Sequence, residues 1–223
     1  MKSSRLAMLL VFFVACSSHE EKKAWEAWMP GVTKVLIIGD SISLGYTPHV
    51  RERLNAFQVQ HGGGDGSNNS SSRETRSQVD SWLVGLGQGD SITWNNGLHE
   101  AMRDALPAVE THISLTEYRE NLHAIAQKLV ATQARIFFFT TTYVPAHISW
   151  QPAIQKRDDL NRVAREVMTD YPEITVVDLG AFSETIKPLM INADLGDDLH
   201  YTSAGYDAIA DFIVNSLWPP KPS

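Results

Sequence analysis

The chain has 223 residues, which suits one sizeable α/β domain and is short for two. A hydrophobic share of 43% with 20% charged residues is typical of a globular protein with a buried core and excludes a fibrous or disordered chain. The net charge of −7 argues against nucleic acid or an anionic membrane surface as a partner of the folded domain, and the single cysteine excludes an internal disulfide and a cysteine-rich zinc site.

The first residues have the layout of an export signal. Lys2 and Arg5 precede an apolar run of about ten residues, which is too short for a membrane-spanning helix of about 20 residues. The segment Phe13–Cys16 resembles the bacterial lipobox, in which the cysteine becomes the lipidated first residue of the mature protein. The alternative is a cleaved signal with an incidental cysteine.

These features divide the chain into three parts. We expect a lipoprotein signal peptide over residues 1–15, a lipid-anchored tether over 16–32 and one domain over 33–217. The resemblance implies an exported lipoprotein that touches the membrane only through its N-terminal lipid. Ser17 stands where inner-membrane lipoproteins commonly carry Asp, which favours the periplasmic face of the outer membrane.

Short apolar runs alternate with helical patterns along the rest of the chain. Expected strands are Thr33–Gly39, Ala56–Gln60, Ser91–Trp94, Arg135–Thr140 and Ile174–Asp178. Expected helices are Glu74–Leu86, Thr116–Thr132 with Thr116 as its N-cap, Gln155–Tyr171 and Ser203–Leu217. This alternation predicts right-handed crossovers and an α/β fold, a three-layer α/β/α sandwich.

Three connecting segments fall at the carboxyl ends of expected strands. They are the glycine- and serine-rich residues 61–72, residues 97–114 and residues 143–152. Ligands of open α/β sheets bind outside the carboxyl ends of the strands, so all three are candidate walls of a site.

A serine follows the first strand directly. In the segment Gly39–Ser43, Ser41 stands where the strand would break into a helix, with its hydroxyl exposed at the sheet edge and its N–H directed at a developing oxyanion. A helix-capping serine is the simpler interpretation of the same residue.

An acidic pair and a histidine precede the last expected helix. Asp197 lies three residues before His200, close enough to accept the imidazole Nδ1–H bond and orient the other ring nitrogen toward a nucleophile. The alternative for His200 is a structural histidine near a helix start.

With both segments in one chain, the sequence resembles the SGNH/GDSL hydrolase family from Thr33 to Leu217. The resemblance implies a flavodoxin-like five-stranded parallel sheet and ester hydrolysis through an acyl-serine, with no cofactor and no metal. It makes Ser41 the nucleophile, His200 the general base and then acid, and Asp197 the orienting carboxylate. The neighbouring Asp198 is the rival for that last role, and the D-x-x-H spacing favours Asp197.

The oxyanion-binding residues are less clearly marked. The family's usual Gly-x-Asn-Asp block is replaced by a segment in which Asn95 fits an Asn-x-Gly form and His99 fits the usual register. A neutral amide donates without titrating, so we expect Asn95 to be the donor, with His99 as a substrate contact or a packing residue. The second donor falls within residues 62–72, where Gly66 is our candidate.

We therefore expect a serine esterase that removes a small acyl group, such as acetyl, from a polar or carbohydrate substrate. One alternative is an O-acyltransferase with the same three residues, and another is a non-catalytic binding lipoprotein. The glycines lack the Gly-Lys-Ser/Thr ending of a phosphate cradle, and the eight histidines show no HExxH spacing. The expected partner is thus a small-molecule or glycan ester, not nucleic acid.

Overall fold

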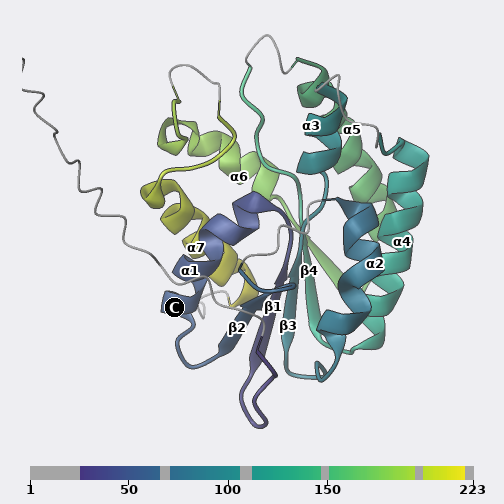
Figure 1. Cartoon of the computed structure of the whole chain (residues 1–223), viewed down its shortest axis with the longest axis vertical. Helices are drawn as coiled ribbons and strands as arrows, with labels where there is room; N and C mark the ends of the chain where they lie inside the picture. Colours follow the sequence, from purple (N-terminus) through teal and green to yellow (C-terminus); the bar gives the residue numbers. More distant parts are fainter. Residues whose placement is uncertain (1–25, 66–70, 106–111, 147–150, 194–197, 219–223) are drawn as a thin grey trace, which may run out of the picture.

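The computed structural model describes residues 26–65, 71–105, 112–146, 151–193 and 198–218. Five strands form one parallel sheet in the order β2-β1-β3-β4-β5, with helices on both faces (Figure 1). The strands are β1 Lys34–Ile38, β2 Gln58–His61, β3 Ser91–Trp94, β4 Arg135–Phe139 and β5 Ile174–Val177. The expected three-layer α/β/α sandwich is confirmed.

Two helical layers enclose the sheet. The helices are α1 Ser41–Arg53, α2 Ser72–Leu83, α3 Leu98–Ala105, α4 Leu115–Ala131, α5 Gln151–Met168, α6 Leu179–Thr185 and α7 Ser203–Leu217, with a 3₁₀ turn at Lys187–Leu189. Helices α1 and α7 pack together on one face, while α2, α4 and α5 cover the other and α3 packs on α5 (Figure 1). Because both faces are covered, β1 is a continuous apolar run, and Val35 to Ile38 are fully buried.

The structure corrects two sequence expectations about helices. Residues 98–105 form α3 within the segment 97–114 that was expected to be a connection. Helix α4 is capped by Ser114, whose Oγ accepts the N–H of Glu117 at 3.1 Å, and not by Thr116. The Ser-x-x-Glu spacing from Ser114 to Glu117 is a capping signal that the sequence does contain.

The segment before β1, residues 26–29, lies across the edge strand β2. The side-chain amide of Gln60 exchanges two hydrogen bonds of 2.8 Å with the backbone of Glu26. The amide of Gln58 accepts from Met29 N at 2.6 Å and donates to Ala27 O at 3.0 Å. Two buried glutamine side chains thus bind the backbone before β1 in the way that the peptide groups of a neighbouring strand would. These bonds hold the start of the domain against the sheet.

The membrane-anchoring residue expected from the sequence, Cys16, lies outside the described residues. Among the helices in the described part of the chain, none combines the length and the apolar character needed to cross a bilayer.

Candidate active site

The carboxyl end of β1 leads directly into α1, and the turn between them presents Ser41. Asp40 is the N-cap of α1, and its Oδ1 accepts the N–H of Ile42 at 3.0 Å. The Ser41 N–H, at the first helical position, points out of the helix end together with the positive end of the helix dipole. The expected strand-to-helix turn is therefore present at Ser41.

His200 reaches Ser41 from the loop before α7. Its Nε2 lies 3.0 Å from Ser41 Oγ, although the two residues are 159 positions apart. Two backbone bonds hold the loop, since Ile191 N donates to His200 O at 2.9 Å and Thr202 N donates to Leu189 O at 2.8 Å. The structure thus brings the predicted nucleophile and the predicted base within hydrogen-bond distance.

The carboxylate at the other ring nitrogen belongs to Asp198. His200 Nδ1 lies 2.7 Å from Asp198 Oδ1, which also accepts the backbone N–H of His200 at 2.8 Å. This second bond closes an Asx turn, in which an aspartate binds the N–H two residues on. Asp197, the carboxylate expected at this nitrogen, lies outside the described residues, and the carboxylate that the structure places there is that of Asp198.

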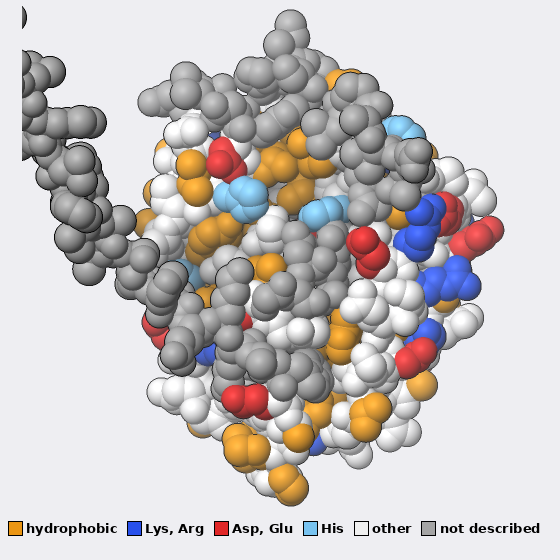
Figure 2. Space-filling view, viewed as in Figure 1, with side chains coloured by type: hydrophobic (Ala, Val, Ile, Leu, Met, Phe, Trp, Pro, Cys, Tyr) orange, Lys and Arg blue, Asp and Glu red, His pale blue; other side chains and the backbone are white. Residues whose placement is uncertain are grey.

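The electrostatics of this pair favour an ionised carboxylate. Partial burial raises the pKa of Asp198, but the hydrogen bonds from the backbone and the imidazole of His200 outweigh it, and the pKa lies below its usual value. Both side chains are partly exposed, at 32% for Asp198 and 43% for His200. Figure 2 shows histidine side chains beside hydrophobic ones in the upper half of the molecule.

Asn95 follows β3 and lies beside the nucleophile turn. A Cβ built on Gly39 would lie 3.7 Å from the Asn95 Cβ, so the two chain segments meet without a side chain between them. Asn95 Nδ2 donates to Phe139 O at 2.7 Å and the residue is 7% exposed. An amide nitrogen carries two hydrogens, so one N–H remains beyond the bond to Phe139.

The two other predicted oxyanion or substrate residues have different outcomes. His99 is the second residue of α3, half-buried and close to Asp40. Burial raises the pKa of Asp40, while the charge of His99 and the N–H groups of Ile42 and Ser43 act in the opposite direction. Gly66 lies outside the described residues.

A buried polar network anchors the residue after Asn95, and the sequence analysis missed it. The Asn96 side chain accepts the Trp94 Nε1–H at 2.7 Å and donates to Thr75 Oγ1 at 3.0 Å. The Asn96 carbonyl accepts the Tyr118 hydroxyl at 2.8 Å and the Thr141 hydroxyl at 3.1 Å. These four bonds come from α2, β3, α4 and the end of β4, and they fix the loop that carries Asn95.

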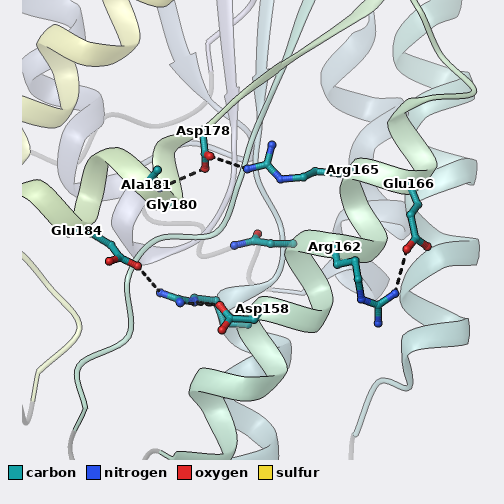
Figure 3. A pocket seen from close by; sticks show the side chains of 10 residues that line it. Asp158, Arg162, Arg165, Glu166, Asp178, Gly180, Ala181 and Glu184 are labelled. Carbon is teal, nitrogen blue, oxygen red and sulfur yellow. Dashed lines mark hydrogen bonds and ion pairs between the residues drawn. The ribbon is translucent and has the colours of Figure 1, made fainter.

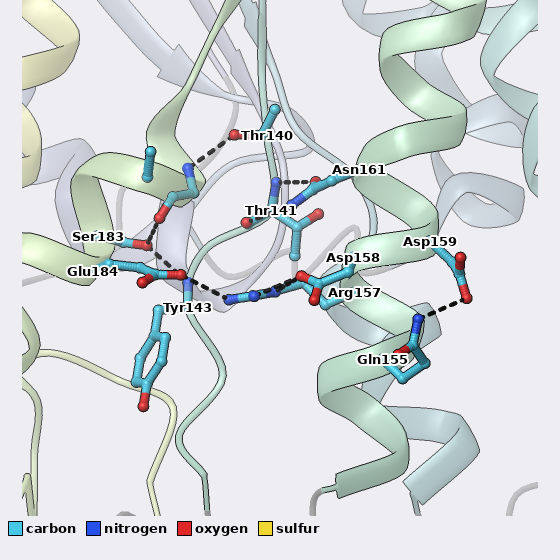
Figure 4. Close-up of polar contacts among 12 residues, drawn as sticks. Thr140, Thr141, Tyr143, Gln155, Arg157, Asp158, Asp159, Asn161, Ser183 and Glu184 are labelled. Atoms are coloured by element: carbon cyan, nitrogen blue, oxygen red, sulfur yellow. Dashed lines mark hydrogen bonds and ion pairs between the residues drawn. The ribbon is translucent and has the colours of Figure 1, made fainter.

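The end of β4 forms a second polar wall at the same sheet edge (Figure 4). Thr140 Oγ1 donates to Asp178 and accepts the Gly180 N–H, both at 2.8 Å. Thr141 N donates to the side chain of Asn161 at 2.8 Å. This edge therefore joins β4 to α5 and α6 through side-chain hydrogen bonds.

A groove of about 470 Å³ lies between α5 and α6, beyond this wall (Figure 3). Its arginines are paired with carboxylates, as in Arg165 with Asp178 at 2.7 Å and Arg162 with Glu166 at 3.0 Å. Neither Ser41 nor His200 lines it. The Arg165–Asp178 pair thus ties α5 to the start of α6, whereas the Arg162–Glu166 pair lies within α5.

A second serine–histidine contact lies buried beneath the nucleophile turn. Ser43 Oγ donates to Asp40 O at 2.6 Å and lies 2.7 Å from His61 Nε2. The other ring nitrogen, Nδ1, lies 3.1 Å from Gly62 O, so both nitrogens of the buried ring have a polar partner. Burial lowers the pKa of His61 to about 4, which keeps the ring neutral near neutral pH.

Because His61 is buried, we expect the protein to lose folding stability as the pH falls. Between pH 6.5 and pH 4 the unfolded chain protonates His61 and the folded chain does not, so the unfolding free energy falls as the pH is lowered. The loss from this group approaches about 3 kcal/mol. His61→Gln keeps an amide that can donate to or accept from Ser43 and cannot titrate, so urea unfolding at pH 7 and pH 4.5 should show a smaller difference in this variant. Equal differences in variant and wild type would contradict the assignment.

Within the described ranges, no three His, Cys, Asp or Glu side chains group so as to hold a metal ion.

No family model matches the sequence, and no curated protein matches it. Solved structures do. LAE5, an α/β hydrolase enzyme from the metagenome of Lake Arreo, is 18% identical with a TM-score of 0.65 over 82% of this chain and 94% of its own. The acetylxylan esterase Axe2 from Geobacillus stearothermophilus is 17% identical with a TM-score of 0.64 over 84% and 95%.

A lipase/acylhydrolase from Enterococcus faecalis is also similar, at 18% identity and a TM-score of 0.62 over 83% of this chain and 95% of its own. These structures are aligned over nearly their whole length. At such identities the likeness concerns the fold, and the chain shares that fold with solved esterases and hydrolases.

Proposed function

We propose that the protein is a serine esterase of the SGNH/GDSL type that hydrolyses a small acyl ester of a polar or carbohydrate substrate. The observation that carries this proposal is the hydrogen-bonded series from Ser41 Oγ to His200 Nε2 at 3.0 Å and from His200 Nδ1 to Asp198 at 2.7 Å. An alcohol needs such an oriented base to become a nucleophile at neutral pH.

Acylation would begin with Ser41 Oγ attacking the ester carbonyl carbon. His200 Nε2 takes the hydroxyl proton as the bond forms, and Asp198 stabilises the resulting imidazolium. The carbonyl oxygen becomes an oxyanion within reach of the Ser41 N–H and an Asn95 N–H. As the tetrahedral intermediate collapses, the C–O bond to the alcohol breaks and His200 gives its proton to the departing oxygen.

Deacylation repeats these steps with water. His200 Nε2 takes a proton from a water molecule that attacks the acyl-serine, and the same donors stabilise the second oxyanion. When the bond from the carbonyl carbon to Ser41 Oγ breaks, the proton returns to Ser41 and the carboxylic acid leaves. In both steps the transferred proton passes through His200 Nε2. This requires His200 Nδ1 to stay protonated and bound to Asp198.

Two observations support the choice of substrate. The sheet edge around Ser41 is rich in buried polar side chains, among them Asn95, Thr140 and Thr141, which suits a polar alcohol more than a long acyl chain. The similar structures include Axe2 and AlAXEase, both named acetyl xylan esterases. We therefore place an O-acetyl ester of a sugar first among the substrates.

The proposal is tested by a serine-reactive phosphonate and a series of esters. The wild type should be labelled with one phosphonate per chain and Ser41→Ala should not, because the reagent needs the activated hydroxyl. Hydrolysis of p-nitrophenyl esters should fall from acetate to octanoate to palmitate. Equal labelling of the variant would refute the nucleophile, and a preference for palmitate would refute the substrate class.

We further propose that lipid attached at Cys16 anchors the enzyme to the periplasmic face of the outer membrane. The support is the lipobox-like segment Phe13–Cys16 and the position of the first described residue, Glu26, strapped to β2. The chain from Cys16 to Glu26 could span at most about 35 Å when extended. Labelled palmitate should enter the wild type and not Cys16→Ser.

A further inference from the structure

Helices α1 and α7 run parallel along a seam that includes the following contacts. Gly45 meets Tyr206, His49 Nδ1 lies 3.1 Å from Asp207 Oδ1, and Arg53 Nε donates to Asp211 Oδ1 at 2.6 Å. The α1 residues are four apart, so they lie on one face of that helix. Because the helices are parallel, their N-termini lie together, and Ser41 begins one while His200 precedes the other.

The first contact of the seam is unusually close. A Cβ on Gly45 would lie 2.2 Å from Tyr206 Cζ and 2.4 Å from Cε1, whereas carbon atoms in ordinary contact are about 3.5–4.0 Å apart. The hydroxyl end of the tyrosine therefore rests on bare helix backbone. Gly45 lies one turn after Ser41, so the ring touches α1 on the face and at the end that carry the nucleophile.

The same ring is held in place on the side of the histidine. Tyr206 packs edge-on against Tyr201, the residue after His200, with ring centroids 5.9 Å apart. Burial raises the pKa of Tyr206 to about 12, and the nearby carboxylates of Asp40 and Asp198 add to this. The ring thus lies between the nucleophile turn and the loop of His200.

We propose that Gly45 and Tyr206 are positioning residues that set the distance between Ser41 Oγ and His200 Nε2. Tyr206 acts as a spacer whose ring meets α1 at Gly45 on one side and packs against the ring of Tyr201, the residue after His200, on the other. The inference rests on the proposed function. A shift of about 1 Å in a reacting group can cost on the order of 10² in rate, and relieving the Gly45 contact would require more than about 1 Å.

The test is a double-mutant cycle read by kcat, KM and the rate of phosphonate labelling. Gly45→Ala should lower kcat and the labelling rate on the order of 10²-fold with little change in KM, although alanine is the better helix former. Tyr206→Ala removes the obstacle, so adding Gly45→Ala to it should cost less than about threefold. Tyr206→Phe keeps the spacer and should retain most of the activity that Tyr206→Ala loses.

Arg53→Met is the matched control at the far end of the seam. It should lower thermal stability and leave kcat within about twofold, because weakening the seam there does not move the helix N-termini. If Gly45→Ala does not fold, Tyr206→Leu takes its place and should lower kcat with KM unchanged. The positioning role is overturned if Gly45→Ala or Tyr206→Leu keeps full kcat. It is also overturned if Gly45→Ala lowers kcat equally in the wild type and in Tyr206→Ala. A wild type that is not labelled refutes the proposed function itself.

Discussion

Replacing Asp198 by asparagine is expected to lower kcat by on the order of 10²-fold. The asparagine can keep the Asx turn to the His200 N–H, so the loop is retained. The same Oδ1 meets both the N–H and the Nδ1–H of His200, so the asparagine oxygen can accept both bonds. What the variant loses is the negative charge that stabilises the imidazolium formed when His200 takes the proton of Ser41. Steady-state kinetics on the acetyl ester measure the loss, and the melting temperature checks the fold.

Asp197→Asn is the matched control for this variant. It makes the same change of charge one residue earlier, and kcat should remain within a few-fold of the wild type. A larger loss from Asp197→Asn than from Asp198→Asn would return the orienting role to the residue that the D-x-x-H spacing favoured. The two variants therefore separate a motif-based assignment from a structural one.

The carboxylate assignment shows where a motif stops being informative. Asp197 and Asp198 are adjacent, and spacing alone permits either to approach a histidine two or three residues on. What decides is the backbone conformation, since the Asx turn directs Asp198 Oδ1 to both the N–H and the ring of His200. A turn that depends on local dihedral angles is not visible in a pattern of residue types.

The strands were predictable because burial on both faces leaves a direct trace in composition, as in Val35 to Ile38. Helix α3 leaves a weaker trace. Its buried residues include Leu98 and Ala101, the helix packs on α5, and eight residues give too few apolar positions for a periodic pattern. Tertiary packing, more than local preference, forms this helix.

The residues of the site likewise fall into those that a sequence motif marks and those that it does not. Ser41 and His200 are marked by motifs, because their chemistry requires those residue types at the ends of particular elements. Asn96, His61 and Gly45 are not marked, because each matters through a contact made by folding: a network from four elements, a hydroxyl beneath the nucleophile turn, and a ring from α7. Supporting residues of this kind become visible only when the helices and strands are placed together.

Asn95→Ala is expected to lower kcat by on the order of 10²–10³-fold, and His99→Ala is expected to lower it much less. Asn95 lies beside the Ser41 turn and keeps an N–H beyond its bond to Phe139, whereas His99 is half-buried on α3 near Asp40. KM should change little, because the oxyanion forms after binding. Kinetics on the acetyl ester for both variants, at matched folded fractions, give the comparison.

Asn95→Asp sharpens this test, because the carboxylate keeps the shape of the amide and loses both N–H groups. If Asn95 donates to the oxyanion, aspartate should be at least as damaging to kcat as alanine, since it adds a negative charge where negative charge develops. Both variants also lose the bond from Asn95 Nδ2 to Phe139 O, so their kcat values are compared at matched folded fractions. Should His99→Ala prove the more damaging change, the donor lies on α3 and the register that places His99 in the family's asparagine position is correct.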